Sequence, residues 1–246
     1  MPPPLKKESA PASTAIRSLF TRIAGIYDRL NRILTFGIDV IWRRRALKRL
    51  NTTPGTVLDL ATGTADFALA AARRFPEVEI LGIDLTPAML DVGRTKIARA
   101  GLDGRIELRE GNALKLDLEA SRFDTVLCAF GFRNFPDPAR ALCEVARVLE
   151  PGGRLLVLEL FRPTSRILGG LTSLWLRLVS PLFARKTRRE YTYLRTSIER
   201  TRSVSEFLEL ARACGFVCER SDFFWPSCSC LVFHRGNGQS DLKQVE

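Results

Sequence analysis

The sequence predicts an α/β protein built on a Rossmann-like, doubly wound and mostly parallel sheet of seven strands. Short apolar strands alternate with helical patterns at the lengths typical of such sheets. The first predicted strand, Thr56–Leu60, leads through a loop of small residues into a helix over Phe67–Phe75, and open α/β sheets hold cofactors at such a turn. With 246 residues, of which 46% are hydrophobic, the chain suits one large core better than two α/β domains.

The predicted strands share short apolar runs bounded by turn residues. The first five are expected to be parallel and the last two to form a closing pair. They are Thr56–Leu60, Val78–Ile83, Ile106–Arg109, Phe123–Ala129, Arg154–Leu160, Phe216–Phe223 and Cys228–His234.

The helices between these strands have recognisable start and stop residues. Thr86 is predicted to cap a helix that has Pro87 at its first position, and Asp137 with Pro138 gives a second such start. Pro151-Gly-Gly153 is expected to stop that second helix before the fifth strand. Apolar residues at helical spacing predict two or three short helices from Ser18 to Leu50 and another over Val204–Cys214.

The chain is expected to form one domain whose segments differ in charge. Residues 1–49 carry 11 basic and 3 acidic side chains and residues 161–203 carry 10 and 2, whereas the segment between them is nearly neutral. The net charge of +11 therefore comes from two basic flanks. The predicted segments are a disordered tail (1–13), an N-terminal helical cap (14–50), a cofactor-binding core (51–160), a basic and apolar lid insert (161–203), a C-terminal helix and strand pair (204–236) and a tail (237–246).

Six cysteines in a chain of this length do not suggest a disulfide framework, and Cys128 and Cys143 are interpreted as buried thiols. Neither histidines nor zinc spacing accompany the other four, so no metal site is predicted. Together with the absence of an apolar leader, this predicts a cytoplasmic protein. The apolar stretch Ile167–Ala184 is broken by Gly169-Gly170, Arg177 and Pro181, which favours a core or membrane-surface helix over a spanning one.

The loop within Val57–Asp66 predicts the kind of cofactor. A dinucleotide needs several glycines so that the backbone can approach a pyrophosphate, but the loop has only Gly63. Asp59 and Asp66 would repel phosphates and suit a cation, which favours S-adenosylmethionine with its sulfonium and zwitterionic end. The alternative is that the small residues only allow close packing of strand and helix.

Two further polar positions follow the next strands. Asp84 ends the strand after Asp59, where a carboxylate can accept both hydroxyl protons of a ribose. Asn112 and Ala113 follow the third strand, near the expected adenine edge, although an asparagine there is also a common turn residue. The substrate side is predicted at Phe130–Phe135, in which Arg133 and Asn134 offer hydrogen-bond donors beside aromatic rings. A structural ion pair of Arg133, with the phenylalanines in the core, is the alternative.

Several motifs in order and at matching spacing resemble one family. They are Tyr27-Asp28, Trp42-Arg43-Arg44, Val57–Asp66, Met89–Lys96, Phe130–Phe135, Arg147–Glu159, Tyr191–Ile198 and His234-Arg235-Gly236. Together they look like the ubiquinone/menaquinone-biosynthesis C-methyltransferases, which are class I S-adenosylmethionine-dependent enzymes. The resemblance implies C-methylation of a prenylated hydroquinone, with demethylmenaquinol as the main expectation and a 2-methoxy-6-polyprenyl-benzoquinol as the alternative. It also implies that Thr64, Asp84, Asn112 and Ala113 contact the cofactor.

The chain departs from the family pattern at Ala65, where a glycine is usual, and at Ala129, where some members have serine. Ala65 is the best argument for a non-catalytic S-adenosylmethionine-binding relative. A nucleic-acid methyltransferase is a further alternative, but no Asn/Asp-Pro-Pro-Tyr-type motif follows the fourth strand, so no nucleic-acid partner is expected.

A ring carbon attacks best when its neighbouring hydroxyl is ionised, and Arg133 is predicted to favour the phenolate, directly or through a water, while Asn134 orients the oxygen. The lone His234 is interpreted as structural.

A polyprenyl tail would keep the substrate in a bilayer, so residues 161–203 are predicted to dock on the anionic inner membrane face, with a solvated basic surface as the alternative. A homodimer is compatible with the sequence, which does not determine the oligomeric state.

Overall fold

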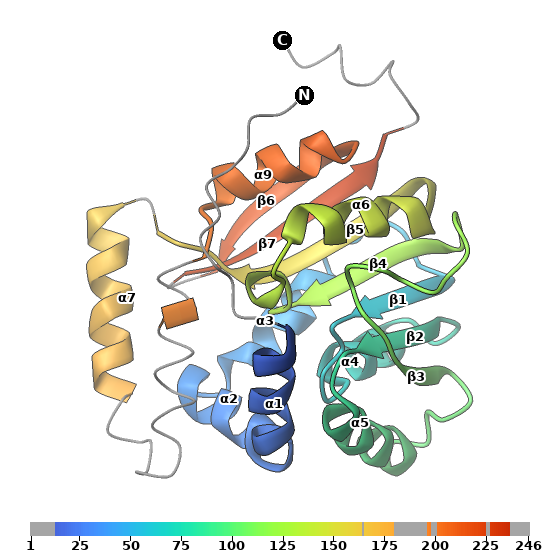
Figure 1. The fold of residues 1–246 in the computed structure, drawn as a ribbon, viewed down its shortest axis with the longest axis horizontal. Coiled ribbons are helices and arrows are strands. Elements are labelled where there is room, and N and C mark those ends of the chain that lie inside the picture. The colour runs from blue at the N-terminus through green and yellow to red at the C-terminus, as the bar shows by residue number, and fades with distance from the viewer. Residues whose placement is uncertain (1–12, 164, 180–195, 198–200, 225–226, 237–246) are drawn as a thin grey trace.

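The computed structural model of the protein describes residues 13–163, 165–179, 196–197, 201–224 and 227–236. Their strands form one sheet in the order β3-β2-β1-β4-β5-β7-β6 (Figure 1). The strands are β1 (Thr56–Leu60), β2 (Glu79–Asp84), β3 (Ile106–Glu110), β4 (Phe123–Ala129), β5 (Leu149–Leu160), β6 (Phe216–Phe224) and β7 (Cys228–Arg235). The helices are α1 (Ser13–Ile23), η1 (Ala24–Ile26), α2 (Tyr27–Thr35), α3 (Ile38–Leu47), α4 (Asp66–Arg74), α5 (Pro87–Arg99), η2 (Phe132–Asn134), α6 (Pro138–Val148), α7 (Arg166–Val179) and α9 (Val204–Ala213).

The strand pairing confirms the predicted doubly wound fold. Strands β1 to β5 pair in parallel, and β7 lies antiparallel between β5 and β6. The chain moves outward from β1 to β2 and β3, then returns to add β4 on the other side of β1. Ligands of open α/β sheets bind at such a reversal, outside the carboxyl ends of the strands. The site is therefore expected between the loops that follow β1, β2 and β4.

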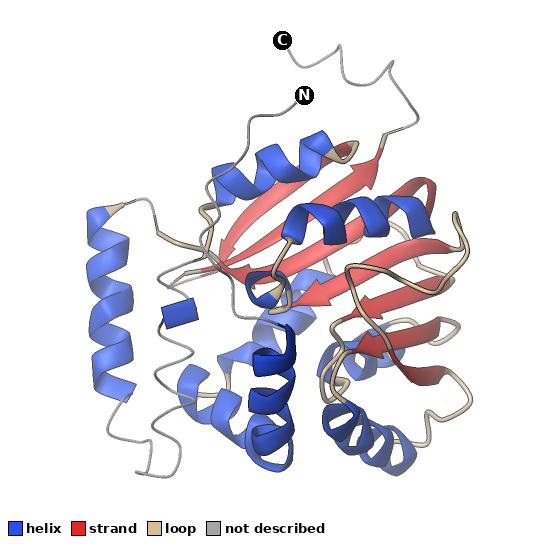
Figure 2. Cartoon of the chain, viewed as in Figure 1, coloured by secondary structure: helices blue, strands red, loops and turns tan. Residues whose placement is uncertain are grey.

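Helices cover both faces of the sheet (Figure 2). One core lies under α3, α4 and α5, with Trp42, Phe67 and Leu90 among its buried members, and Trp175 of α7 packs against it. The other core lies under α6 and α9, where Leu142 and Phe207 are buried. Helices α3, α4, α5, α6 and α9 thus turn apolar side chains to the sheet.

Most predicted element boundaries agree with the structure to within a few residues. Asp137 caps α6, because its side chain accepts the Arg140 amide at 3.0 Å. Thr86 occupies the N-cap of α5 with Pro87 after it, but its side chain makes no capping bond. Strand β5 begins at Leu149, earlier than the predicted Arg154, because Leu149 already pairs with Phe123 ahead of a register shift.

The prediction that Cys143 is a buried thiol is wrong. Cys143 of α6 forms a disulfide with Cys214, the residue that follows α9, and their Cα atoms lie 5.1 Å apart. The two cysteines lie 71 residues apart in the sequence, but α6 and α9 cover the same face of the sheet. Cys128 is a buried free thiol, as predicted.

Three predicted segments fall wholly or partly outside the described residues. They are the two tails and about half of the lid insert, of which residues 161–163, 165–179, 196–197 and 201–203 are described. The tyrosine-containing element Tyr191–Ile198 is described only at residues 196–197. Within the described part of the chain, no helix combines the length and the apolar character needed to cross a membrane.

Candidate functional site

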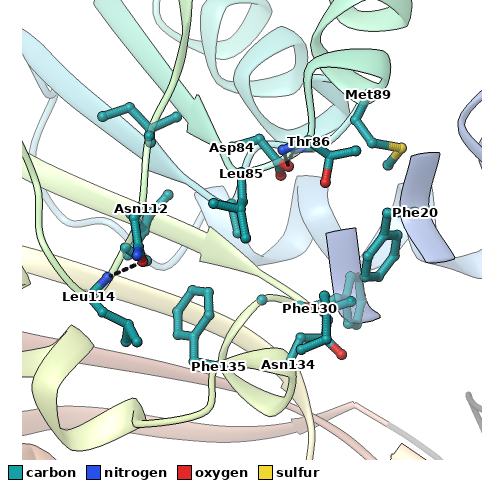
Figure 3. Close-up of a pocket in the computed structure, with 18 of the residues that line it drawn as sticks. Phe20, Asp84, Leu85, Thr86, Met89, Asn112, Leu114, Phe130, Asn134 and Phe135 are labelled. Atoms are coloured by element: carbon teal, nitrogen blue, oxygen red, sulfur yellow. Dashed lines mark hydrogen bonds between the residues drawn. The ribbon is translucent and has the colours of Figure 1, made fainter. Parts of the chain in front are cut away.

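A pocket opens at the carboxyl ends of β1, β2 and β4, where the strand order reverses (Figure 3). It is an open pocket that encloses about 770 Å³ when the solvent space at its mouth is counted. The loops after these strands and after β3 line it from the sheet side, and α1 and α2 contribute Ile16, Phe20 and Tyr27 from the other side.

The loop after β1 takes an unusual backbone path. Ala61, Gly63 and Ala65 all have left-handed backbone angles, with φ of 55°, 56° and 63°. Such angles favour glycine and cost other residues energy. A Cβ atom added at Gly63 would lie 3.4 Å from the methyl carbon of Met89, another lining residue. The backbone of the loop at Gly63 therefore lies close to the other residues that line the pocket.

Asp84, at the end of β2, anchors this loop and lines the pocket. Its Oδ2 accepts the Gly63 amide at 2.9 Å and its Oδ1 accepts the Thr86 amide at 2.9 Å. Burial raises the pKa of this carboxyl above its ordinary value, while the bonds from Thr86 and Gly63 act in the opposite direction. Asp84 thus combines a fixed orientation with lone pairs at the pocket, as the predicted ribose-binding role requires.

Asp59 lies beneath the loop and is not among the residues that line the pocket. Its side chain is buried, and Oδ2 accepts bonds from Thr62 Oγ1 at 2.6 Å and from the Ala68 amide at 3.0 Å. Burial raises the pKa of Asp59 to about 7, against the lowering effect of these two bonds. The structure therefore places Asp59 as a support of the turn between β1 and α4.

We expect Asp59 to make the stability of the protein depend on pH. Because its folded pKa of about 7 exceeds the ordinary 3.8, the folded state holds a proton that the unfolded state releases, and stability falls as pH rises from about 4 to 7. Between pH 5.5 and 8 this amounts to about 2 kcal/mol. Urea unfolding at both pH values should show that Asp59→Asn loses this part of the dependence. An identical pH slope in both proteins would contradict the assignment.

Thr64, predicted to contact the cofactor, is a buried residue of the loop and is not among the lining residues. Its hydroxyl donates to Asp28 at 2.5 Å, and Lys96 Nζ lies 2.6 Å from Asp28 and 2.5 Å from Asp66. This network ties α2 to the loop and to α5. No pattern in the sequence predicted this network, although Asp28 belongs to one of the motifs that resemble the family.

Asn112 and Ala113 line the pocket below the end of β3. The Asn112 Oδ1 accepts the Leu114 amide at 2.9 Å, the interaction drawn in Figure 3. This is a local turn bond of the kind that the alternative reading of Asn112 anticipated. Both residues nevertheless lie at the pocket, as predicted.

The segment after β4 places its predicted residues in different environments. Asn134 lines the pocket with Phe130 and Phe135, and its Nδ2 donates to the Phe130 carbonyl at 3.1 Å (Figure 3). Arg133 does not line the pocket. Its Nη1 lies 2.6 Å from Glu159 Oε1 and donates to the Phe130 carbonyl at 2.8 Å. This geometry matches the structural alternative for Arg133, and a direct part in catalysis stays a prediction.

No sequence pattern predicted that α1 and α2 line one side of the pocket. Ile16 and Phe20 of α1 and Tyr27 of α2 line the pocket, and Met89 of α5 faces it beside Phe20 (Figure 3). Helical periodicity showed that α1 has an apolar side but not what that side contacts. His234, in contrast, pairs in the sheet with Arg154, at the amino ends of the parallel strands and away from the pocket.

Ala65 does not crowd the pocket, because its methyl group is buried in the core and is not part of the lining. Ala65→Gly would relieve roughly 1–2 kcal/mol of left-handed strain but lose a buried methyl group and add backbone entropy to the unfolded chain. We expect the free energy of unfolding to change by less than about 1 kcal/mol and the Kd for S-adenosylmethionine to change by less than about threefold. Calorimetric titration checks this, and tenfold tighter binding by the variant would contradict it.

Comparison with known proteins gives one consistent family match. The sequence profile described as the ubiE/COQ5 methyltransferase family matches residues 7–233. The demethylmenaquinone methyltransferase of Deinococcus radiodurans is 43% identical over 206 residues, covering 82% of this chain and 85% of that protein. The ubiquinone/menaquinone biosynthesis C-methyltransferase UbiE of Syntrophotalea carbinolica is 42% identical, covering 81% and 85%.

Solved structures show the same fold at low sequence identity. The [4+2]-cyclase SpnF superposes with a TM-score of 0.70 at 16% identity, covering 93% of this chain and 97% of that one. A SAM-dependent methyltransferase from Aquifex aeolicus gives a TM-score of 0.60 at 17% identity, covering 78% and 89%. At these identities the likeness concerns the fold alone.

Proposed function

The chain belongs to the ubiE/COQ5 methyltransferase family, and we propose that it transfers a methyl group from S-adenosylmethionine to a ring carbon of a prenylated hydroquinone. Demethylmenaquinol is the proposed substrate, because several similar relatives are named as demethylmenaquinone methyltransferases. A 2-methoxy-6-polyprenyl-benzoquinol remains the alternative, since other relatives are named as ubiquinone/menaquinone enzymes.

The residues of the pocket fit the cofactor. Asp84 offers a carboxylate to the ribose, Gly63 lets the backbone approach, and Asn112 lies beside apolar Leu85 and Leu114, where an adenine ring would be enclosed. When bound, S-adenosylmethionine supplies an electrophilic methyl group on a positively charged sulfur. Asp59 adds negative charge behind the loop as it ionises. The Asp84 carboxylate at the pocket and the single glycine of the loop thus favour a cationic ligand over a pyrophosphate.

The substrate side is carried by one observation: Phe130, Asn134 and Phe135 line the same pocket as Asp84. The phenylalanine rings can hold a flat aromatic ring, and the Asn134 amide can orient its hydroxyl oxygen. With S-adenosylmethionine bound, these residues would hold a ring carbon against the methyl group that the cofactor supplies. The carbon would bond that methyl group, whose bonding electron pair stays with the leaving group, and would then release its proton to water. Apolar walls exclude bulk water and so strengthen the polar contacts that align the ring.

Arg133 is proposed to act on this reaction from behind the pocket wall. Its guanidinium binds the Phe130 carbonyl and Glu159, so that it fixes the segment that carries Asn134. Arg133→Lys keeps the charge but not the paired geometry, and near-normal turnover in that variant would argue against this role.

The proposal includes peripheral association with the inner membrane face, because a polyprenyl substrate resides in the bilayer. The basic flanks of the sequence support this, and so does the exposed apolar side of α7, where Ile167, Leu171 and Leu174 are solvent-accessible.

Radiolabelled methyl transfer tests the proposal. The protein is incubated with labelled S-adenosylmethionine and, in separate reactions, with chemically reduced demethylmenaquinone, a reduced methoxy-benzoquinone and RNA. Label in the naphthoquinol product supports the main proposal, and label in the benzoquinol alone supports the alternative. Label in RNA alone, or in none of the three with S-adenosylmethionine bound, would overturn it.

A further inference from the structure

A second hollow, separate from the pocket, lies between α3, α4 and α5. Eight of its lining side chains are basic and one, Asp66, is acidic. Arg44 of α3, Arg73 of α4 and Arg99 of α5 are all exposed, so three separate helices direct cations toward one basic groove. A concave surface with one sign of charge concentrates counter-ions. The groove is therefore suited to an anionic ligand.

Within the described residues the charges of this groove are only partly neutralised. Lys96 and Arg32 bind Asp66, and Arg43 binds Asp39. No described acid lies within ion-pair distance of Arg44, Arg73 or Arg99. Exposed cations without an acid beside them would gain from a bound anion.

An apolar tip adjoins the groove at the turn between α2 and α3. Phe36, Ile38 and Ile41 expose 66%, 37% and 48% of their surfaces. Ile41 precedes Arg44 and Lys48 at helical spacing, so the outward side of α3 changes from apolar to basic along its length. Cations next to exposed apolar side chains are typical of surfaces that meet a membrane interface.

Phe36 is the most informative residue of this tip. It has left-handed backbone angles, φ 50° and ψ 34°, as the residue that ends α2. A bulky side chain in that conformation is a rare outlier, and glycine or asparagine would fit better. Because the ring is also largely exposed, neither backbone geometry nor burial explains a phenylalanine here. A partner for the ring would explain it.

We propose that the face made by the basic groove and the Phe36–Ile41 tip docks on an anionic phospholipid leaflet. Lipid phosphates bind the groove cations, while Phe36 and Ile41 enter the boundary between headgroups and acyl chains. Trp175 places α7, with its own exposed apolar side, on the same face of the sheet. The inference rests on the proposed function in one respect: docking would serve to bring a lipid-soluble quinol to the pocket.

Sedimentation with vesicles of phosphatidylglycerol and phosphatidylcholine tests the groove. The variant Arg73→Gln/Arg99→Gln should lower the partition coefficient for anionic vesicles by about thirtyfold, which corresponds to about 1 kcal/mol for each cation. The matched control is Arg122→Gln/Arg212→Gln, which removes the same charge from exposed positions outside the groove. Equal losses in both variants would overturn the proposal. So would groove-dependent binding of inorganic pyrophosphate without vesicle binding.

Phe36→Asn tests the tip with a substitution that should not destabilise the fold. Asparagine suits the left-handed conformation, so the melting temperature should stay the same or rise, while vesicle binding should fall roughly tenfold because about 1.5 kcal/mol or more of apolar burial is lost. Methyl transfer to a quinol with a short, water-soluble tail should be unchanged. Unchanged vesicle binding would overturn the docking surface, whereas failure of the wild type to methylate any quinol would instead count against the proposed function.

Discussion

Glu159→Ala is expected to lower the free energy of unfolding by about 3–5 kcal/mol, because it leaves a buried arginine without its counter-charge. The side chains of Arg133 and Glu159 are 8% and 1% exposed, and their charged atoms lie 2.6 Å apart. For a chain of this length the loss corresponds to a fall of roughly 10 °C in Tm. Calorimetry or urea unfolding measures it directly.

The same substitution should abolish most of the methyl transfer. Phe130 has a left-handed backbone with φ of 60°, and Arg133 and Asn134 both donate to its carbonyl oxygen. Glu159 holds Arg133 in that position and also accepts the Arg133 and Leu160 amides. Without Glu159 the segment can relax from its strained conformation and move Asn134, and a displacement of about 1 Å can cost on the order of 100-fold in rate.

Two comparisons make this expectation specific. Asp91→Ala breaks the Asp91–Arg94 pair, whose side chains are 72% and 52% exposed, and should cost less than about 1 kcal/mol. The double variant Arg133→Met/Glu159→Met removes both buried charges and should recover much of the stability but not the activity. If Glu159→Ala were no more destabilising than Asp91→Ala, the buried pair would not stabilise the fold.

The sequence predicted the sheet because its signals are local. Each strand has its own apolar run and turn residues, and the reversal of strand order follows from the strand–helix alternation. Convergence of the loops after β1, β2 and β4 then places Gly63, Asp84 and Asn134 at one pocket, as the structure shows. The early start of β5 at Leu149 could not be predicted, because it depends on pairing with Phe123.

What the sequence could not predict depends on packing between distant segments. The Cys143–Cys214 disulfide requires α6 and α9 to lie side by side, and the Lys96–Asp28 pair joins residues 68 apart in the sequence. The direction of a side chain at a strand end is equally non-local. Asp59 and Asp84 both follow apolar runs in neighbouring strands, the first as the penultimate residue of β1 and the second as the last residue of β2. Asp59 supports the loop from beneath, whereas Asp84 lines the pocket.

The second large effect is expected for Asp84→Asn, which should weaken binding of S-adenosylmethionine by about 100-fold. A neutral amide is a weaker acceptor than a carboxylate by about 1 kcal/mol for each hydrogen bond, and two ribose hydroxyls are proposed to donate to Asp84. The amide also puts an N–H donor where one oxygen now accepts a backbone amide from Gly63 or Thr86. Calorimetric titration with S-adenosylmethionine and with its demethylated product measures the effect.

Asp124 provides a matched control. It lies near the start of β4, at the opposite end of the parallel strands from the pocket. Its Oδ2 also accepts two backbone amides, from Gly55 at 2.7 Å and Thr56 at 2.8 Å, but it is not among the residues that line the pocket. Asp124→Asn should therefore lower stability to a similar extent while leaving cofactor affinity within about twofold. Affinity should also fall for the wild type as pH decreases, because burial raises the pKa of Asp84 and protonation removes its charge. Equal losses of affinity in both variants would mean that Asp84 acts on the fold and not on the cofactor.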